Sequence, residues 1–187
     1  MERFIKSLTT NEITDIIIKN LAERSFPIFL PKFYAAGFDE VDVFAISSSG
    51  YMYEFEIKRS RSDFLADFKN KSHKHQKLLN GEAIYIYDEW KRGYKTGGEI
   101  TRIIIPNRFF FVCEINMIKP EELPDYCGLV YIEKENFIEV KPAKLIHRIK
   151  ADEKIYKRIA SVLSQRIIFG CSYYTYKHKL NQLINDT

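Results

Sequence analysis

The pattern that most limits the fold of this chain is a β-hairpin predicted at residues 41–58. A short apolar run beginning at Asp42 is followed by the turn Ser-Ser-Ser-Gly and then by the alternating segment Glu54-Phe-Glu-Ile-Lys58. Side chains of a strand alternate between its two faces, so Glu54, Glu56 and Lys58 share one face of the second strand. Asp42 is the single acid within the first strand. We therefore expect carboxylates and a lysine to converge at the open end of the hairpin, where they can hold a divalent cation.

The remaining sequence predicts helices and further strands around this hairpin. Thr9 and Glu12 are typical of a helix start, because a hydroxyl and an acid three residues apart can cap the first turn. Ser60 and Asp63 repeat this pattern, and the apolar spacing that follows favours a helix in both places. We expect a first helix of about four turns from Thr9 and further helices at 60–80, 152–169 and 173–183. Strands are expected at 41–47, 51–58, 84–87, 109–113, 129–132 and 137–140.

The breaks between these elements, together with the length of the chain, favour one α/β domain. Pro27 and Pro31 are expected to bracket an irregular segment, and the polar, glycine-rich residues 88–99 to form a surface loop. A chain of 187 residues has room for one domain with a hydrophobic core. We expect a single domain over residues 1–187, with its core at about 9–148 and C-terminal helices at about 150–185.

The composition excludes some classes of protein and leaves others open. The net charge of +4 permits a nucleic-acid partner without requiring one. Whether the chain binds nucleic acid therefore depends on where its charges cluster. Cys113, Cys127 and Cys171 are widely spaced, which supports neither a zinc site nor a disulfide framework. No segment approaches the roughly eighteen apolar residues that span a bilayer, so we expect no membrane partner and a cytoplasmic location.

Asp42 and Glu56 are the candidate ligands of a divalent metal. Mg²⁺ prefers hard oxygen ligands and keeps several waters, so two carboxylates and the backbone carbonyl of Ile57 suffice to hold it. Such an ion supplies Lewis acidity for the hydrolysis of a phosphodiester, and Mn²⁺ can substitute for it. Lys58 shares the face of Glu56 and can stabilise the negative charge that develops on the phosphate. Glu54 lies on the same face, one step deeper, and is expected to support the site.

The hairpin and the helix behind it carry a longer motif. Asp42 is followed by Glu56-Ile-Lys58-Arg-Ser-Arg-Ser-Asp63-Phe-Leu-Ala-Asp67-Phe-Lys69, a lysine strand that runs into a polar helix. This arrangement resembles the PD-(D/E)xK nuclease superfamily, and within it the MmcB-type DNA-repair proteins and their phage-borne relatives. The segments at 106–112 and 120–132 also resemble that group, so the likeness covers most of residues 9–148. It implies a restriction-endonuclease-like fold, a mixed central β-sheet flanked by helices, with the active site at the hairpin mouth.

Two ligand assignments stay open. The proline that names the superfamily motif is absent, and Asp39 is an alternative to Asp42 as the first ligand. The superfamily often adds a glutamate from the first helix, where Glu12 matches by position and Glu23 is the second choice. Glu12 is equally suited to capping its own helix.

The segment after the hairpin is rich in basic residues and is a candidate nucleic-acid interface. A row of Lys and Arg side chains can neutralise phosphates, although a solvated surface is the ordinary fate of a run of charges. The expected phosphate contacts are Arg59, Arg61, Lys69, Lys71, Lys74 and Lys77. The resemblance adds Asp63, a first-turn acid of the predicted helix, and Gln76 as supporting residues. His73 and His75 diverge on a helix and are expected at the surface.

These observations predict Mg²⁺-dependent hydrolysis of DNA, an endonuclease-like activity in DNA repair, recombination or phage DNA metabolism. A non-catalytic DNA-binding or scaffold module on the same fold is the alternative from another class, and cleavage of RNA is a third. The set of Asp42, Glu56 and Lys58 favours an enzyme, because a pure binder has no reason to place acids where phosphate must lie. The oligomeric state stays open, a homodimer included.

Overall fold

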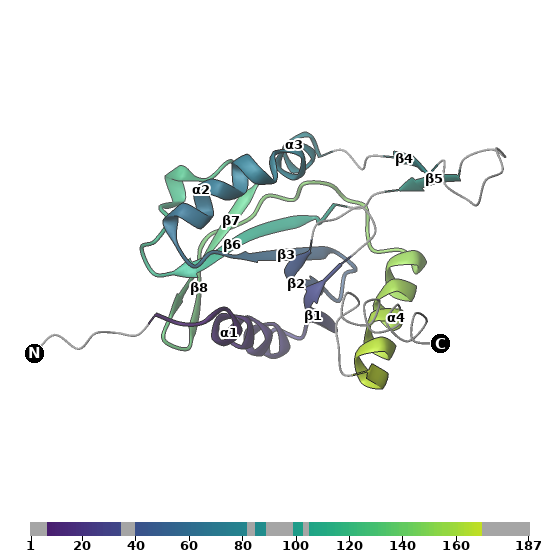
Figure 1. Ribbon diagram of the computed structural model, residues 1–187, viewed down its shortest axis with the longest axis horizontal. Coiled ribbons are helices and arrows are strands. Elements are labelled where there is room, and N and C mark those ends of the chain that lie inside the picture. Colours follow the sequence, from purple (N-terminus) through teal and green to yellow (C-terminus); the bar gives the residue numbers. More distant parts are fainter. Residues whose placement is uncertain (1–6, 35–39, 82–84, 89–98, 103–104, 170–187) are drawn as a thin grey trace, which may run out of the picture. The chain divides into compact units, whose positions relative to one another are not determined.

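The computed structural model describes residues 7–34, 40–81, 85–88, 99–102 and 105–169. The chain divides into two compact units, Met1–Lys150 and Ala151–Thr187. The first unit contains a six-stranded sheet with helices on its faces, and the second contains helix α4 (Glu153–Phe169) (Figure 1). The core predicted at about 9–148 falls within the first unit.

The central sheet of the first unit is mixed. Its strands, in spatial order, are β1 (Ile28–Phe33), β2 (Val41–Ile46), β3 (Met52–Ile57), β6 (Arg108–Glu114), β7 (Cys127–Glu133) and β8 (Asn136–Lys141). β6 is parallel to both of its neighbours, β3 and β7, and the other neighbouring pairs are antiparallel. A parallel pair needs a long crossover, and the connection from β3 to β6 provides one that contains α2 (Arg61–Asn70) and α3 (Ser72–Asn80). The prediction of an α/β fold with a mixed sheet is confirmed.

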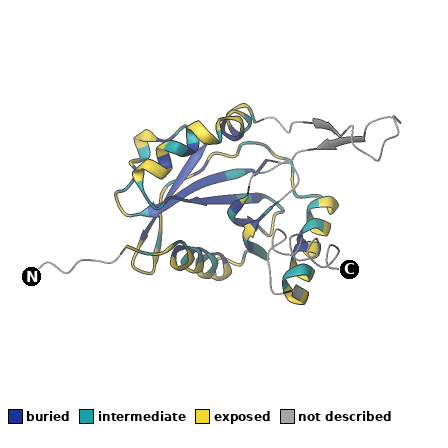
Figure 2. Cartoon of the chain, in the orientation of Figure 1, coloured by how far each residue is buried: buried dark blue, intermediate teal, exposed yellow. Residues whose placement is uncertain are grey.

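Helices cover both faces of this sheet, with α1 (Thr10–Glu23) on one face and α2 and α3 on the other (Figure 1). The α1 side buries Ile13, Ile17, Leu21, Val43, Ala45, Phe55, Ile57, Phe110 and Val112. The α2–α3 side buries Phe64, Leu78, Phe109, Phe111, Cys113, Cys127 and Leu129. Successive residues of β6 therefore alternate between two cores, and Figure 2 shows the central strands in the dark blue of buried residues.

The contact between β6 and β7 leaves no space for a side chain at Gly128. This residue is the register partner of Phe110 on β6. A Cβ at this position would lie 2.4 Å from the Phe110 ring and 2.8 Å from the backbone nitrogen of Ala143. Because protein interiors are close-packed, only glycine lets the strand, the ring and the chain after β8 meet here.

The sequence does not predict β1, and the expected break at Pro27 and Pro31 is wrong. Pro31 lies inside β1 as the register partner of Val43. Proline cannot donate a ladder hydrogen bond, so it is tolerated only where one side of the strand is free of pairing. β1 is the outermost strand of the sheet and meets this condition.

The predicted helix at 60–80 is two helices in the structure. α2 ends at Asn70 and α3 begins at Ser72, and Lys71 between them is non-helical, with φ −113° and ψ 33°. A break of this kind resets the helical phase, so spacing across it no longer tells which side chains share a face.

The other predicted elements in the described part of the chain agree with the structure to within two residues at each end. β4 (Tyr85–Asp88) forms a separate two-stranded sheet with β5 (Glu99–Arg102), a strand that the sequence does not predict. Residues 89–98 of the predicted loop and the helix predicted at 173–183 lie outside the described residues. Across the described residues, no helix combines the length and the apolar character needed to cross a bilayer.

Candidate active site

β2 and β3 bring the predicted acids and the lysine to one face of the sheet. Phe44 is the register partner of Glu54, so the same register, continued two residues toward the open end of the hairpin, places Asp42 opposite Glu56 on the same face. Glu54, Glu56 and Lys58 lie on the α2–α3 side and are only 1%, 3% and 3% exposed. The prediction that the β3 side chains share a face is confirmed.

Asp42 is half-buried at the open end of the hairpin. Its Oδ2 accepts a hydrogen bond from the backbone N–H of Ile57 at 2.8 Å. Burial, and then the negative charge of Glu56, raises the pKa of Asp42 from 3.8 to about 6. A carboxylate in this position is poorly stabilised at neutral pH, and a cation shared with Glu56 relieves its repulsion. Asp39, the alternative ligand, lies outside the described residues.

Glu56 is surrounded by three lysines. Its Oε1 accepts hydrogen bonds from Nζ of Lys58 at 3.1 Å and of Lys71 at 2.6 Å, and its Oε2 accepts one from Nζ of Lys74 at 3.0 Å. Burial favours the neutral acid, but the positive charges of Lys74, Lys58 and Lys71 hold the pKa of Glu56 below its ordinary value. Glu56 is therefore a charged carboxylate in the described structure, as a metal ligand has to be.

Glu54 and Lys74 form a second layer beneath Glu56. Nζ of Lys74 makes an ion pair with Oε1 of Glu54, and Oε2 of Glu54 has no hydrogen-bond partner among the described residues. Burial raises the pKa of Glu54, and Lys74 offsets part of that effect. Lys74 is only 6% exposed, so the prediction that it is a surface contact for phosphate is wrong. The two acids of β3 attract this lysine inward, where it neutralises them.

Lys58 has a second carboxylate partner that the sequence analysis does not assign to the site. Its Nζ donates to Oδ1 of Asp67 on α2 at 2.6 Å. Oδ2 of Asp67 lies 2.7 Å from Nε2 of His75 on α3, and Nδ1 of His75 lies 2.8 Å from the hydroxyl of Tyr126. His75 is buried, so its predicted place at the surface is wrong. A signal for Asp67 exists in the sequence, because it occupies an inward position of the helix between Phe64 and Phe68.

The residues expected to support the site differ in whether they lie near Lys58 and the acids of β3. Ser60 is the N-cap of α2, because its Oγ accepts from the backbone N–H of Asp63 at 3.1 Å. Asp63 is an acid of the first turn, and its carboxylate lies 3.9 Å from Nζ of Lys58. Glu12 and Thr9 form the predicted capping box of α1. Gln76 is exposed, and no described interaction joins it to the acids or lysines of β3. Among the expected supporting residues, the structure therefore brings Glu54 and Asp63 next to the site.

The remaining predicted phosphate contacts lie at or near the surface. Lys69 is exposed, and Lys77 is partly exposed. Arg61 is exposed and forms an ion pair with Glu122, and Nη2 of Arg59 donates to Ser7 Oγ at 3.3 Å. Lys71 instead reaches inward to Glu56, with its side chain 27% exposed.

The oxygen donors near Asp42 fit the preferences of Mg²⁺. Asp42 and Glu56 are hard carboxylate donors, and the repulsion that contributes to the raised pKa of Asp42 shows that the two charges interact. In the described residues, no group of three or more His, Cys, Asp or Glu side chains is placed to hold a metal. The expected site has only two such side chains plus the Ile57 carbonyl. A metal on Glu56 Oε1 has to replace the ammonium of Lys71 there.

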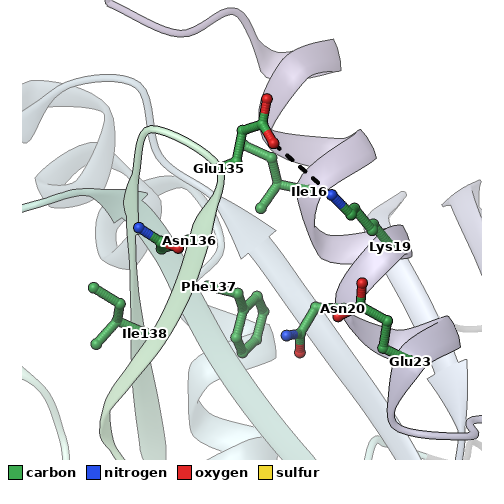
Figure 3. Close-up of a pocket in the computed structure, with 8 residues that line it drawn as sticks. All are labelled: Ile16, Lys19, Asn20, Glu23, Glu135, Asn136, Phe137 and Ile138. Carbon is green, nitrogen blue, oxygen red and sulfur yellow. Dashed lines mark ion pairs between the residues drawn. The ribbon is translucent and has the colours of Figure 1, made fainter.

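A separate pocket of about 500 Å³ lies on the other side of the sheet, between α1 and the β7–β8 hairpin (Figure 3). The ring of Phe137 faces Asn20 of α1 there, and Lys19 and Glu135 form an ion pair of 3.8 Å at its edge. Glu23, the second choice for a ligand from the first helix, lines this pocket. It is therefore on the α1 side, away from the face that carries Glu56.

Comparison with known proteins gives a fold and no activity. No family model matches the chain, and no curated protein matches it. Among solved structures, the chain is similar to the SPO1766 protein of unknown function from Silicibacter pomeroyi, with a TM-score of 0.52 and 20% sequence identity. The match covers 87% of this chain and 94% of that protein. At this identity the similarity shows a shared α/β fold alone.

Proposed function

We propose that this chain is a metal-dependent nuclease that hydrolyses phosphodiester bonds of DNA on a restriction-endonuclease-like core. The observation that carries the proposal is the placement of Asp42 opposite Glu56, with Lys58 on the same face, at the open end of a hairpin in a mixed sheet. The resemblance of the surrounding motif to MmcB-type proteins supports a role in DNA repair, recombination or phage DNA metabolism.

The three side chains have complementary tasks in this proposal. Asp42, Glu56 and the carbonyl of Ile57 hold Mg²⁺, for which Mn²⁺ can substitute, and this ion supplies Lewis acidity at the phosphate. Lys58, whose pKa is raised by Glu56 and Asp67 despite burial, stays an ammonium and stabilises negative charge on the phosphate oxygens. Water has limited access to Lys58, which strengthens this electrostatic effect.

The exposed and partly exposed basic side chains on and before α2 and α3 supply contacts to the nucleic-acid backbone. Arg59 lies between β3 and α2, Lys69 lies on α2 and Lys77 lies on α3, the segment that follows the acids of β3 and Lys58 in the chain. Such contacts release counterions, so binding should weaken as the salt concentration rises.

The alternative is a non-catalytic nucleic-acid-binding module, and one observation favours it. Glu56 already has three lysine partners and needs no metal to stabilise its charge. In that case Asp42 and Glu56 are structural, and removing them should leave nucleic-acid binding unchanged or stronger. Cleavage of RNA is the third possible function and is tested in the same assay.

The experiment is a cleavage assay on single-stranded, duplex and branched DNA and on RNA, with Mg²⁺, Mn²⁺ or EDTA. Glu56→Gln and Lys58→Met keep the shapes of these buried side chains and should each abolish cleavage. Glu135→Gln, at a side chain 85% exposed on the β7–β8 turn, is the matched control and should cleave like the natural protein.

Cleavage that needs a divalent metal and disappears in both site variants supports the proposal. Binding to DNA without cleavage, unaffected by EDTA, contradicts it and establishes the binding module. Cleavage of RNA alone corrects the substrate class and leaves the chemistry of the site in place.

A further inference from the structure

Lys58 is fixed at its tip by a chain of buried hydrogen bonds that extends well away from the metal-binding acids. The chain runs from Nζ of Lys58 to Asp67, then to His75 and to Tyr126, with successive heavy-atom distances of 2.6, 2.7 and 2.8 Å. Lys58 directly follows β3, Asp67 lies on α2, His75 lies on α3, and Tyr126 is the residue before β7. Lys58, Asp67 and His75 are close in sequence, with separations of 9 and 8 residues, and the last hydrogen bond joins them to Tyr126, 51 residues from His75.

We infer that Asp67, His75 and Tyr126 are positioning residues, which hold the ammonium of Lys58 beside Glu56 in the orientation that a phosphate oxygen requires. The role of Lys58 in catalysis rests on the proposed nuclease function. The fixed position of its ammonium group, which Asp67, His75 and Tyr126 determine, does not depend on that function. His75 and Tyr126 lie outside the motif that supports that function, and Asp67 lies within its helical part but has no assigned role there.

The chemistry of Asp67 fixes the direction of each hydrogen bond. Burial favours the neutral acid, but the hydrogen bonds from His75 and Lys58 lower the pKa of Asp67 far below its ordinary value, so it is a carboxylate and only accepts. Oδ1 faces Lys58 and Oδ2 faces His75, so rotation of the carboxylate breaks one bond or the other. Nε2 of His75 must therefore carry a proton, and in the neutral ring Nδ1 accepts from the Tyr126 hydroxyl.

The packing around His75 restricts the movement of the ring. The ring of Phe68 lies 4.4 Å from the His75 ring between centroids, at an interplanar angle of 31°, and the rings of Phe109 and Phe111 lie at 5.9 and 6.0 Å. These aromatic walls exclude water from the hydrogen bonds, which strengthens them. The direction in which Asp67 points is therefore set from the α3 side as well as from Lys58.

Other charges close to the ammonium fit the same arrangement. Lys71 Nζ lies 3.5 Å from Oδ1 of Asp67, and an oxygen of Asp63 lies 3.9 Å from Nζ of Lys58. An ammonium has three N–H donors, and Lys58 directs two of them to Glu56 and Asp67. With two donors directed by carboxylates, the third has a defined direction, and this is the donor that a phosphate oxygen would accept from.

The test compares Tyr126→Phe and His75→Gln with Tyr131→Phe. Tyr126→Phe removes one hydroxyl and keeps the ring, and His75→Gln keeps a donor for Asp67 but loses the link to Tyr126. Tyr131 is the matched control, since it is a buried tyrosine of β7 whose hydroxyl donates to the carbonyl of Ile118 instead. The first readout is nitrogen-15 NMR of the Lys58 ammonium, which needs neither metal nor DNA.

We expect exchange of the Lys58 ammonium protons with water to become about fivefold faster in Tyr126→Phe and in His75→Gln, and to stay unchanged in Tyr131→Phe. Unchanged exchange in both variants overturns the inference, whatever the cleavage assay gives. If one variant does not fold, as judged by near-ultraviolet circular dichroism, the other decides.

The cleavage assay separates this inference from the proposed function. In a chain that cleaves DNA, the two variants should lower kcat about fivefold with KM unchanged, because only the orientation of Lys58 changes. A fall in kcat without faster ammonium exchange contradicts positioning. Absence of cleavage by the natural chain overturns the nuclease function, while faster exchange in the variants still supports the hold on Lys58.

Discussion

At the scale of single residues, Asp42 is held in a state that costs stability. Its pKa in the folded chain is about 6 against an ordinary 3.8, so the folded state binds this proton more tightly than the unfolded state. The cost of its charge is therefore fully present above pH 6 and is lost as the pH falls toward 4.

Asp42→Asn should raise the free energy of unfolding at pH 7.5, because the amide oxygen can still accept from Ile57 and no charge is buried. The pKa difference sets an upper limit of roughly 3 kcal/mol, and we expect about 1–2 kcal/mol. The gain should vanish near pH 4, as urea unfolding at both pH values will show. Asp15→Asn, on the exposed side of α1, is the control, and an equal gain at both pH values in Asp42→Asn contradicts the prediction.

Gly128→Ala should destabilise the chain by about 1–3 kcal/mol or more, because the new Cβ overlaps the Phe110 ring and the backbone at Ala143. Gly50→Ala is the comparison, since its Cβ meets Lys150 at an ordinary 3.4 Å and only the φ of +84° is unfavourable. That change should cost about 1 kcal/mol. If urea unfolding shows the same loss of stability in both variants, the contact between β7 and the Phe110 ring can adjust to the new Cβ.

Residues of the candidate site differ in how well the sequence predicts them. Glu54, Glu56 and Lys58 are predictable together, because alternation within one strand fixes their common face. Lys74 and His75 are not, because a charged residue in a polar segment is ordinarily at the surface. Their burial depends on ion pairs and hydrogen bonds to residues distant in sequence, which local patterns do not contain.

At the scale of elements, the break between α2 and α3 brings Lys71 to Glu56. A continuous helix from 60 to 80 directs its basic residues by one periodicity, whereas the break at Lys71 starts a new phase. The sequence marks the start of α2 and the end of α3, but it does not mark the break between the two helices, because neither proline nor glycine lies there. The edge strand β1 is missed for the opposite reason, since Pro31 marks a break that the sheet does not have.

Lys71→Ala should strengthen binding of Mg²⁺ and Mn²⁺ by about tenfold, because the ammonium no longer competes for Oε1 of Glu56. Titration calorimetry with either metal is the measurement. Lys69→Ala, an exposed lysine of α2, is the matched control and should bind metal like the natural chain. Unchanged or weaker binding in Lys71→Ala means that the lysine and the metal do not share a position.

At the scale of the whole molecule, both hydrophobic cores belong to the first unit. Their members and the residues packed against them lie between Leu8 and Ile146. The order of helices and strands in this unit is largely predictable from apolar periodicity. The order of strands in space is not, because the placement of β6 beside β3 depends on contacts between segments far apart in the sequence.

A chain that ends at Lys150 should keep cooperative unfolding, with a Tm within about 5 °C of the full chain, because both cores stay complete. Circular dichroism during heating is the measurement. A chain that ends at Lys134 is the control, since it lacks β8 and exposes one edge of β7, and it should not unfold cooperatively. Loss of cooperativity in the longer truncation would assign part of the core to residues after 150.

The parallel pairing of β3 with β6 also bears on how the chain is assembled. The hairpin of β2 and β3 is local, but β6 joins β3 only after a connection of 50 residues, from 58 to 107, has closed. Closing such a loop costs about 3–4 kcal/mol in chain entropy. Until then β3 is an open edge, and Glu54, Glu56 and Lys58 place charges on it that disfavour pairing with another chain. The same side chains thus protect the nascent hairpin from aggregation before they have any partner across the crossover.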